Sequence, residues 1–251
     1  MKELERWARS PKFFLRAAAI GVLTRDWPTG TLLEVGAGTG EMTVEFLERG
    51  FRAHLYDLGD DTRAGLRARF AGNPAVDVVD TIDALPDESV DALLAFEVLE
   101  HIDDDLAALR AWTRKLRPGG RLLVTVPAHQ RKFSETDRRV GHVRRYERGA
   151  LRALIAGAGY ADIDIACYGF PLGNLGRVAG NLLERRVAVP HGEDAVERSI
   201  RSGTEQPAAV VRVSRVLRPW MLRPFFVAQR LTFGLDVGDG YVACAVRPVP
   251  R

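Results

Sequence analysis

The chain has 251 residues, of which 46% are hydrophobic and 27% are charged. This length and composition predict one large domain with a sizeable core and exclude a largely disordered chain. Two cysteines exclude a disulfide scaffold and a cysteine-rich zinc site, so a reducing cytoplasm is the expected compartment. No apolar run reaches 18 residues, and the charged N-terminus lacks the apolar core of a signal peptide, so no membrane span is predicted.

The net charge of +3 is unevenly distributed along the chain. Residues 1–170 carry 24 basic and 26 acidic groups, net −2, whereas residues 171–251 carry 12 and 7, net +5. A surface that binds nucleic acid would need a stronger basic bias than this. No nucleic-acid partner is therefore expected.

The first predicted element is an amphipathic helix at 12–24, inside an N-terminal helical cap of residues 1–28. From residue 31 onward, apolar strands alternate with helical segments. The predicted strands are residues 31–35, 52–56, 75–79, 90–96 and 121–126. The predicted helices between them are 41–48, 61–70 (with Asp60 or Asp61 as its cap) and 103–116. This alternation predicts a parallel, doubly wound sheet.

The pattern changes after residue 127, where a polar, arginine-rich stretch precedes a predicted helix at 148–158. Two further strands are predicted, at 161–167 and 241–246, with a helical insert at 171–237 between them. The insert divides into an amphipathic helix at 172–183, a polar linker at 187–206, and an apolar, basic segment at 208–233. Pro219 and Pro224 must break that last segment into short helices.

A glycine-rich turn, Gly36-Ala37-Gly38-Thr39-Gly40, follows the first predicted strand. Such a turn lets a ligand approach the backbone and points helix N–H groups at it. Glu41 stands where a dinucleotide-binding fingerprint needs its third glycine, and the absence of Gly-Lys-Ser/Thr excludes a phosphate-binding P-loop. Asp57 ends the next strand, 21 residues after Gly36, where a carboxylate can accept hydrogen bonds from ribose hydroxyls. The alternative is a helix-capping or surface aspartate.

Four segments, EVGAGTGEMT, LYDLGDD, DALPDESVDALLAFEVLEHIDD and LRPGGRLLVTVP, together resemble class I S-adenosylmethionine (SAM)-dependent methyltransferases over residues 30–170. The resemblance implies an α/β fold with a doubly wound, seven-stranded, Rossmann-like sheet whose last strand is antiparallel. It also implies SAM as cofactor and S-adenosylhomocysteine as product. Residues 161–167 and 241–246 suit the last two strands, which would place Cys167 and Cys244 on neighbouring strands as core thiols.

Carried over residue by residue, the resemblance implies a cofactor role for four groups in chain order. The turn after the first strand lines the methionine and ribose portion, with Glu34, Gly36, Ala37, Gly38 and Gly40. Asp57 holds the ribose, and Leu58 packs near the adenine. The residues after the third strand flank the adenine: Asp80, Thr81 and Ile82. The family often has aspartate at the place of Thr81, which leaves Asp80 as the substitute. The residues after the fourth strand close over the sulfonium end: Phe96, Glu97 and Val98.

The acceptor side is predicted around two histidines, His129 and His142. The segment from Asp137 to Tyr146 has the pattern D-x4-G-H-x-R-R-Y and resembles that of a subgroup of bacterial methyltransferases. In one interpretation either histidine is a general base oriented by Asp137, and the acceptor, anionic or phenolic, is gripped by Arg144, Arg145 and Tyr146. In the other, the segment is an internal clamp in which Asp137 pairs with Arg145 and Tyr146 covers the core.

A divalent cation is a further possibility at Glu97-Val98-Leu99-Glu100-His101. If a helical turn begins at Glu97, then Glu97, Glu100 and His101 share one face, and His129 or His142 could complete the ligand set. The motif is similar to E-x-x-E-H motifs that bind metal in some ubiquinone-type and small-RNA 2′-O-methyltransferases. The alternative is a metal-free site in which His101 only starts a helix.

The resemblance predicts a SAM-dependent methyltransferase that acts on a small-molecule acceptor, at oxygen because of the candidate bases in 129–146. N- or C-methylation, a lipid or quinone acceptor, and a non-catalytic SAM-binding regulatory protein are the alternatives. For the insert at 171–237 three interpretations remain open: a lid, a face for a homodimer, or a surface at 208–233 that rests on an anionic membrane.

Overall fold

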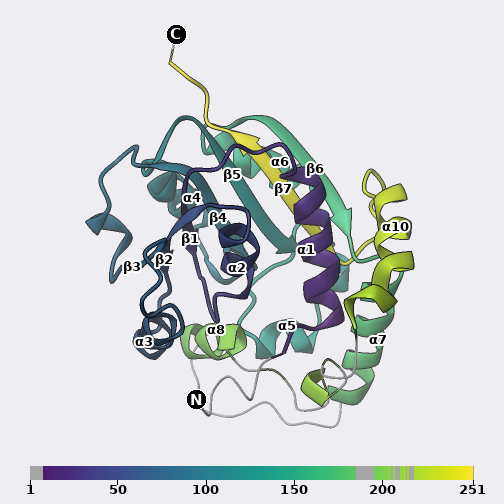
Figure 1. Cartoon of the computed structure of the whole chain (residues 1–251). Coiled ribbons are helices and arrows are strands. Elements are labelled where there is room, and N and C mark those ends of the chain that lie inside the picture. Colours follow the sequence, from purple (N-terminus) through teal and green to yellow (C-terminus); the bar gives the residue numbers. More distant parts are fainter. Residues whose placement is uncertain are drawn as a thin grey trace.

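One mixed sheet forms the centre of the computed structural model, which describes residues 8–184, 195–204, 206, 210–212, 214 and 218–250. Its strands are Thr31–Val35 (β1), Arg52–Tyr56 (β2), Val76–Val78 (β3), Val90–Phe96 (β4), Leu116–Pro127 (β5), Ala161–Tyr168 (β6) and Gly240–Val246 (β7). They lie in the order β3-β2-β1-β4-β5-β7-β6 (Figure 1). Strands β1 to β5 pair in parallel, and β7 runs antiparallel to both β5 and β6. The predicted fold class is confirmed.

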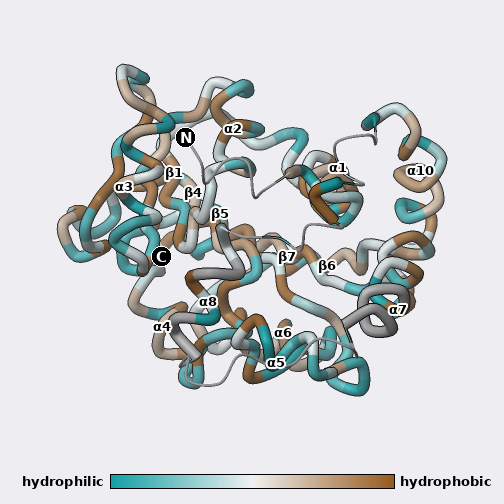
Figure 2. The backbone as a smooth tube through the Cα atoms, turned by 90° about the horizontal axis from the view of Figure 1, so that it is seen from below, coloured by the Kyte–Doolittle hydropathy of each residue, from teal (hydrophilic) through white to brown (hydrophobic). Residues whose placement is uncertain are grey.

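Helices cover both faces of the sheet (Figure 2). One face carries Pro11–Leu23 (α1), Glu41–Leu47 (α2) and Asp60–Arg69 (α3), whose apolar side chains form one buried cluster with the strands. The other carries Asp105–Thr113 (α4) and Arg148–Gly157 (α6), which belong to a second cluster. Because β4 is packed on both faces, its sequence VDALLAF is almost continuously apolar rather than alternating.

Most predicted ends shift by one or two residues, and the strand predicted at 121–126 extends over 116–127. The helix predicted at 103–116 ends at Thr113, because Leu116 already pairs with Val90 and the Pro-Gly-Gly sequence lies within β5. The N-cap of α3 is Gly59, and neither of the two aspartates that follow it, so both lie in the first helical turn. Negative charge there is favourable for the helix dipole without any capping hydrogen bond.

Among the described residues, the insert contains the helices Leu172–Glu184 (α7), Ala195–Thr204 (α8) and Arg223–Leu231 (α10), and the 3-10 turn Pro219–Leu222 (η5). Residues 210–212 and 214 are helical as well. Pro219 and Pro224 each lie in a first turn, where proline lacks only a hydrogen bond that the helix would not make, so the predicted break is confirmed. The predicted linker at 187–206 is wrong over 195–204, because α8 forms there. The rest of that linker, apart from Gln206, and much of 207–217 lie outside the described residues.

Helix α8 lies directly against the cofactor turn. The backbone of Gly203 approaches Gly38, and the side chain of Ile200 approaches Gly59, each so closely that a Cβ added at the facing glycine would meet it. The helix also contacts the 3-10 turn Leu99–His101 (η3). This position fits the interpretation of the insert as a lid, which stays a prediction.

The outer face of η5 and α10 is apolar and exposed at Trp220 (66% exposed), Val227 (62%) and Leu231 (81%). The interpretations of this segment as a dimer face or a membrane-resting surface stay predictions. None of the described helices is long and apolar enough to cross a membrane. Cys167 is buried on β6 and Cys244 is half-buried on the neighbouring β7, as the resemblance implies.

Candidate active site

The glycine-rich turn between β1 and α2 is held in a conformation that only glycine adopts without strain. Gly36, Gly38 and Gly40 have φ angles of 71°, 53° and 74°. The amides of Gly36 and Ala37 donate to the carbonyl of Tyr56 at 2.8 and 3.1 Å, which ties the turn to the end of β2. A side chain at Gly36 would collide with Val98 at the end of β4. Three of the four strand ends that the resemblance assigned to SAM, those of β1, β2 and β4, therefore meet at this turn.

Asp57 is the buried carboxylate of this turn. Its Oδ2 accepts a hydrogen bond from the amide of Gly38 at 2.9 Å, and its Oδ1 accepts one from the amide of Gly59 at 3.1 Å. Burial raises the pKa of Asp57, although both amides oppose the shift. Asp57 is therefore not a surface aspartate. Leu58 beside it is 56% exposed, so its side chain is free to pack against an adenine ring.

The residues expected to flank the adenine have other contacts in this structure. Asp80 is exposed and pairs with Arg67 at 2.7 Å, and this hydrogen bond lowers its pKa. The hydroxyl of Thr81 accepts the amide of Asp83 and caps the short turn Ile82–Ala84 (η2). Ile82 packs against the core. Their role at the adenine stays a prediction.

Glu34 at the end of β1 is buried and accepts a hydrogen bond from the hydroxyl of Thr43 at 2.6 Å. Burial raises the pKa of Glu34 to about 7. Glu34 therefore links β1 to α2 beneath the glycine-rich turn.

Glu97 follows β4 with a φ of 57°, and its side chain points in a direction that the sequence did not predict. Its Oε2 lies 2.6 Å from Nζ of Lys12 on α1, and its Oε1 lies 3.4 Å from the hydroxyl of Tyr168. Burial by itself would raise the pKa of Glu97, but Lys12 and Arg16 outweigh it and hold the pKa at about 2. Glu97 is therefore an anion, paired across 85 residues with the N-terminal helix. Its role at the sulfonium end stays a prediction.

Arg16 on α1 lies near Phe96 and Glu97, and the sequence did not single it out. Among the residues that the structure describes, nothing accepts a hydrogen bond from Arg16 or pairs with it as an ion, and its Nε is buried. Its guanidinium carbon lies 5.9 Å from the ring of Phe13 and 5.9 Å from the ring of Phe96. A guanidinium left this way at the edge of a cofactor site has unused donors for a carboxylate. A signal existed in the sequence: Lys12 and Arg16 are cations at i and i+4 inside an otherwise apolar helix.

Glu100, His101 and His142 come together beside η3. One ligand atom from each lies within 4.8 Å of the others, which is close enough to hold a metal ion. Neither carboxylate oxygen of Glu100 has a hydrogen-bond partner among the described residues, and Oε1 lies 3.7 Å from Nε2 of His142. Burial and the nearby Glu97 raise the pKa of Glu100 well above its usual range. An unsatisfied buried carboxyl of this kind fits a site built for a cation.

The two histidines of this cluster are oriented by groups behind them. Asp137, at the start of the short helix Glu135–Arg139 (α5), places Oδ1 3.0 Å from Nδ1 of His142. The carbonyl of Gly141 lies 3.1 Å from Nδ1 of His101. Burial, with His142 adding to it, lowers the pKa of His101 to about 4, so its ring is neutral at physiological pH. Such outer partners fix which nitrogen faces a metal or a substrate.

The predicted ligand set is corrected in two places. Glu97 does not share a face with Glu100, because η3 begins only at Leu99 and Glu97 points to Lys12. His129 is buried elsewhere, with Nδ1 3.4 Å from Glu147 and its ring 5.6 Å from that of Tyr241. Of the two candidate histidines, only His142 joins the cluster.

The rest of the 137–146 segment forms internal contacts, as the clamp interpretation describes. Arg145 Nε lies 2.8 Å from Asp137. Burial would raise the pKa of Asp137, but the hydrogen bond with His142 and the charge of Arg145 hold it far below its usual range. The hydroxyl of Tyr146 donates to Asp105 at 2.7 Å, and Arg144 pairs with the same carboxylate at 2.9 Å. Burial and Asp105 raise the pKa of Tyr146, so this phenol stays protonated.

Known proteins resemble both the sequence and the fold. Residues 5–165 match the methyltransferase domain family. A "Ubiquinone biosynthesis O-methyltransferase" of Paramagnetospirillum magneticum is 38% identical over 101 residues, 39% of this chain and 41% of the relative. A "Probable S-adenosylmethionine-dependent methyltransferase" of Mycolicibacterium smegmatis is 32% identical over 165 residues, 62% of this chain and 63% of the relative. The chain thus spans less than two thirds of the length of these curated relatives.

Two solved structures share the fold at low identity. A SAM-dependent methyltransferase of Thermotoga maritima, described as a possible histamine N-methyltransferase, has a TM-score of 0.59 at 19% identity and covers 98% of this chain and 95% of its own. Phosphoethanolamine N-methyltransferase 2 of Haemonchus contortus, in complex with SAM, also has a TM-score of 0.59 at 19% identity, over 96% of this chain and 54% of that one. With a family match over more than half of its length and this strand order, the chain belongs to the class I SAM-dependent methyltransferases.

Proposed function

We propose that the chain transfers the methyl group of SAM to an oxygen atom of a small-molecule acceptor. The observation that carries this proposal is the cluster of Glu100, His101 and His142 next to the sulfonium-end residue Glu97. A hydroxyl acceptor must lose its proton during transfer, and this cluster offers both a base and a cation site for that step.

In this proposal, each part of SAM is bound by a different group of residues. Asp57 accepts from the ribose hydroxyls, and the turn at Gly36 and Gly38 lets the cofactor approach the backbone. Arg16 supplies the unused donors for the carboxylate of the methionine portion. Glu97, an anion held by Lys12, faces the positive sulfonium end.

The reaction is an in-line displacement. The acceptor oxygen attacks the methyl carbon, the bond from that carbon to sulfur breaks, and S-adenosylhomocysteine leaves. The proton of the acceptor passes to Nε2 of His142, whose other nitrogen is held by Asp137 at 3.0 Å. The site mainly has to align donor and acceptor, because the sulfonium already activates the carbon.

A divalent cation fits the same three residues, which offer one carboxylate and two imidazole ligands. Bound there, it would lower the pKa of an acceptor hydroxyl. The buried carboxyl of Glu100 would gain the partner that the described residues do not provide. In that case His142 acts as a ligand rather than as the base.

The relatives support oxygen as the methylated atom only by likeness, since the ubiquinone biosynthesis O-methyltransferase matches 39% of this chain. A lipid or quinone acceptor is favoured by one observation, the exposed apolar face of Trp220, Val227 and Leu231.

The test is a screen with SAM labelled in its methyl group. Paired acceptors that differ only in a hydroxyl or an amine are incubated with the chain, and the products are identified by mass. We expect labelled O-methyl product together with S-adenosylhomocysteine. Label appearing only on the amine member of each pair would overturn the oxygen assignment, and no product from any acceptor or cell extract would favour a non-catalytic SAM-binding protein.

A further inference from the structure

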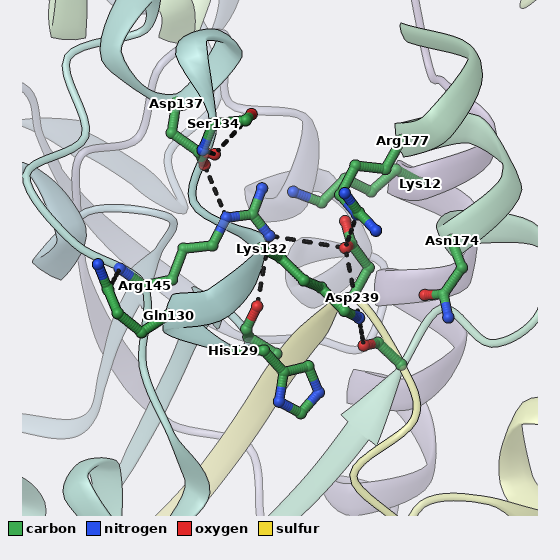
Figure 3. Close-up of polar contacts among 12 residues, drawn as sticks. Lys12, His129, Gln130, Lys132, Ser134, Asp137, Arg145, Asn174, Arg177 and Asp239 are labelled. Carbon is green, nitrogen blue, oxygen red and sulfur yellow. Dashed lines mark hydrogen bonds and ion pairs between the residues drawn. The ribbon is translucent and has the colours of Figure 1, made fainter. Parts of the chain in front are cut away.

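Three cationic side chains converge on one buried carboxylate at the acceptor side of the sheet (Figure 3). Asp239 precedes β7, and its Oδ1 lies 2.8 Å from Nε of Arg177 on α7. The same oxygen lies 3.5 Å from Arg145 and 3.8 Å from Nζ of Lys132, in the short turn Gln130–Lys132 (η4). The three cations come from three separate segments, so the arrangement is a product of the tertiary fold.

Positive charge exceeds negative charge in this cluster. Arg145 is matched by Asp137 at 2.8 Å, and the adjacent Lys12 is matched by Glu97 at 2.6 Å. Lys132 donates to the carbonyl of Gly238 at 2.5 Å, and its charge and that of Arg177 have only Asp239 as a nearby anion among the described residues. Burial lowers the pKa of Lys132, and Arg177 and Arg145 lower it further against the opposing effect of Asp239. Side-chain exposures of 13% for Lys132, 7% for Arg145 and 22% for Arg177 show that little water is present to compensate this surplus.

The contact between Arg177 and Asp239 is close but poorly directed. Nε of Arg177 and Oδ1 of Asp239 are 2.8 Å apart, yet both atoms are buried without a hydrogen bond of acceptable geometry to any described residue. A guanidinium forms its strongest contacts when two N–H groups face a planar anion. Nε of Arg177 is therefore an unused donor, and a small rotation of the side chain would direct it at a ligand.

The cluster lies next to Lys12 on α1 (Figure 3). Lys12 joins it to Glu97, and Glu97 in turn lies 3.4 Å from the hydroxyl of Tyr168 at the end of β6. An acceptor whose reacting oxygen is near the sulfonium can thus place a second group among these cations.

We propose that Lys132, Arg145 and Arg177 form a subsite for a carboxylate or phosphate group of the acceptor, and that Asp239 is the internal counter-ion that occupies it in the absence of acceptor. This inference rests on the proposed function, because it describes the second group of the same methyl acceptor. It narrows the acceptor to an anionic small molecule. It also assigns the basic insert a role through Arg177, which α7 delivers to the site.

The test measures anion binding by calorimetry on the full chain saturated with S-adenosylhomocysteine, with inorganic phosphate and benzoate as probes. We expect saturable binding of at least one probe. Arg177→Gln should weaken it about tenfold, because one charge-assisted contact is lost. Asp239→Asn should strengthen it several-fold, because the competing carboxylate is gone while the cations remain. A purely structural ion pair would not produce this opposite pair of effects.

Arg152→Gln is the matched control, since Arg152 is an exposed arginine on α6 that donates to the carbonyl of Ile163. It should leave probe binding unchanged. Phosphate binding without benzoate binding assigns a phosphate group, and the reverse assigns a carboxylate. No saturable binding of either probe, or equal affinities in wild type, Arg177→Gln and Asp239→Asn, would overturn the subsite. If S-adenosylhomocysteine itself does not bind, the proposed function has failed rather than the subsite.

Discussion

Oδ1 of Asp137 lies 3.0 Å from Nδ1 of His142, and this contact turns Nε2 of His142 toward Glu100, 3.7 Å away. Asp137 and His142 belong to the segment after β5, whereas Glu100 belongs to η3. Their alignment determines which ring nitrogen is free for a proton or a cation.

His142→Ala should reduce methyl transfer at least about 100-fold, because the base or ligand at the acceptor is lost. SAM affinity, measured by calorimetry, should stay unchanged, since no cofactor contact is assigned to His142. His54→Ala is the control: His54 pairs with Asp77 on the β2–β3 edge of the sheet. Full turnover in His142→Ala would leave the segment as a structural clamp only.

Removal of divalent cations tests the second role of the cluster. We expect chelation to stop turnover and Mg²⁺ or Mn²⁺ to restore it. Binding of Mn²⁺, followed by electron paramagnetic resonance, should be lost in Glu100→Gln, because this change removes the only carboxylate among the three ligands. Turnover that ignores the chelator, together with no Mn²⁺ binding, would leave His142 as a base alone.

Arg16→Gln should raise the dissociation constant of SAM about 10- to 100-fold, because a charge-assisted contact to the methionine carboxylate is lost. Decarboxylated SAM should bind the wild type and Arg16→Gln equally well. Arg110→Gln, a change at an exposed arginine that donates to the carbonyl of Gly157, should bind SAM like the wild type. An equal loss of affinity for both ligands would show that Arg16 supports the fold rather than the carboxylate.

Asp57→Asn should weaken SAM binding by about tenfold or more, because a neutral amide accepts ribose hydrogen bonds less strongly than a carboxylate. Asp61→Asn, in the first turn of α3, is the matched surface change. Calorimetry with SAM compares the two variants. Equal affinity in both would contradict the assignment of Asp57 to the ribose.

Glu34 should make the free energy of unfolding depend on pH. In the unfolded chain glutamate ionises near pH 4.3, whereas burial raises the pKa of Glu34 to about 7. Between these values the unfolded chain releases the proton and the folded chain keeps it, so this contribution falls as pH rises and is constant above about 7. Relative to Glu34→Gln, the wild type should lose up to about 3 kcal/mol between pH 4.5 and pH 7. Urea unfolding of both proteins at pH 5 and pH 8 measures the difference, and parallel curves would contradict the buried assignment.

The predictable part of the site is local in sequence. Gly36, Gly38 and Gly40 need positive φ angles, and that requirement is visible in the residues themselves. Asp57 follows from its place at the end of the next strand. The seven-stranded sheet and its antiparallel last strand followed from the resemblance, and the structure has both.

The unpredicted part depends on contacts between distant segments. Glu97 and Glu100 are three residues apart, and helical spacing assigned them to one ligand set, but the backbone at Glu97 has a φ of 57° and sends its carboxylate to Lys12. A polar linker was predicted at 195–204, but helix α8 forms there and its Gly203 lies against Gly38 of the glycine-rich turn. Spacing rules describe neighbours along one element and do not include the element packed against it.

By itself, the sequence determined the alternating elements, the glycine-rich turn and the position of Asp57 at a strand end, because periodicity, glycine and strand ends act over a few residues. Only the tertiary structure decided that His142 rather than His129 meets Glu100, and that Lys132, Arg145 and Arg177 share Asp239. It also decided that Arg16 finds no hydrogen-bond acceptor in the described part of the chain. These contacts depend on the charge and burial of side chains that are up to about a hundred residues apart in the sequence. The side chains meet only after the sheet has formed, because the sheet brings the segments that carry them to one edge.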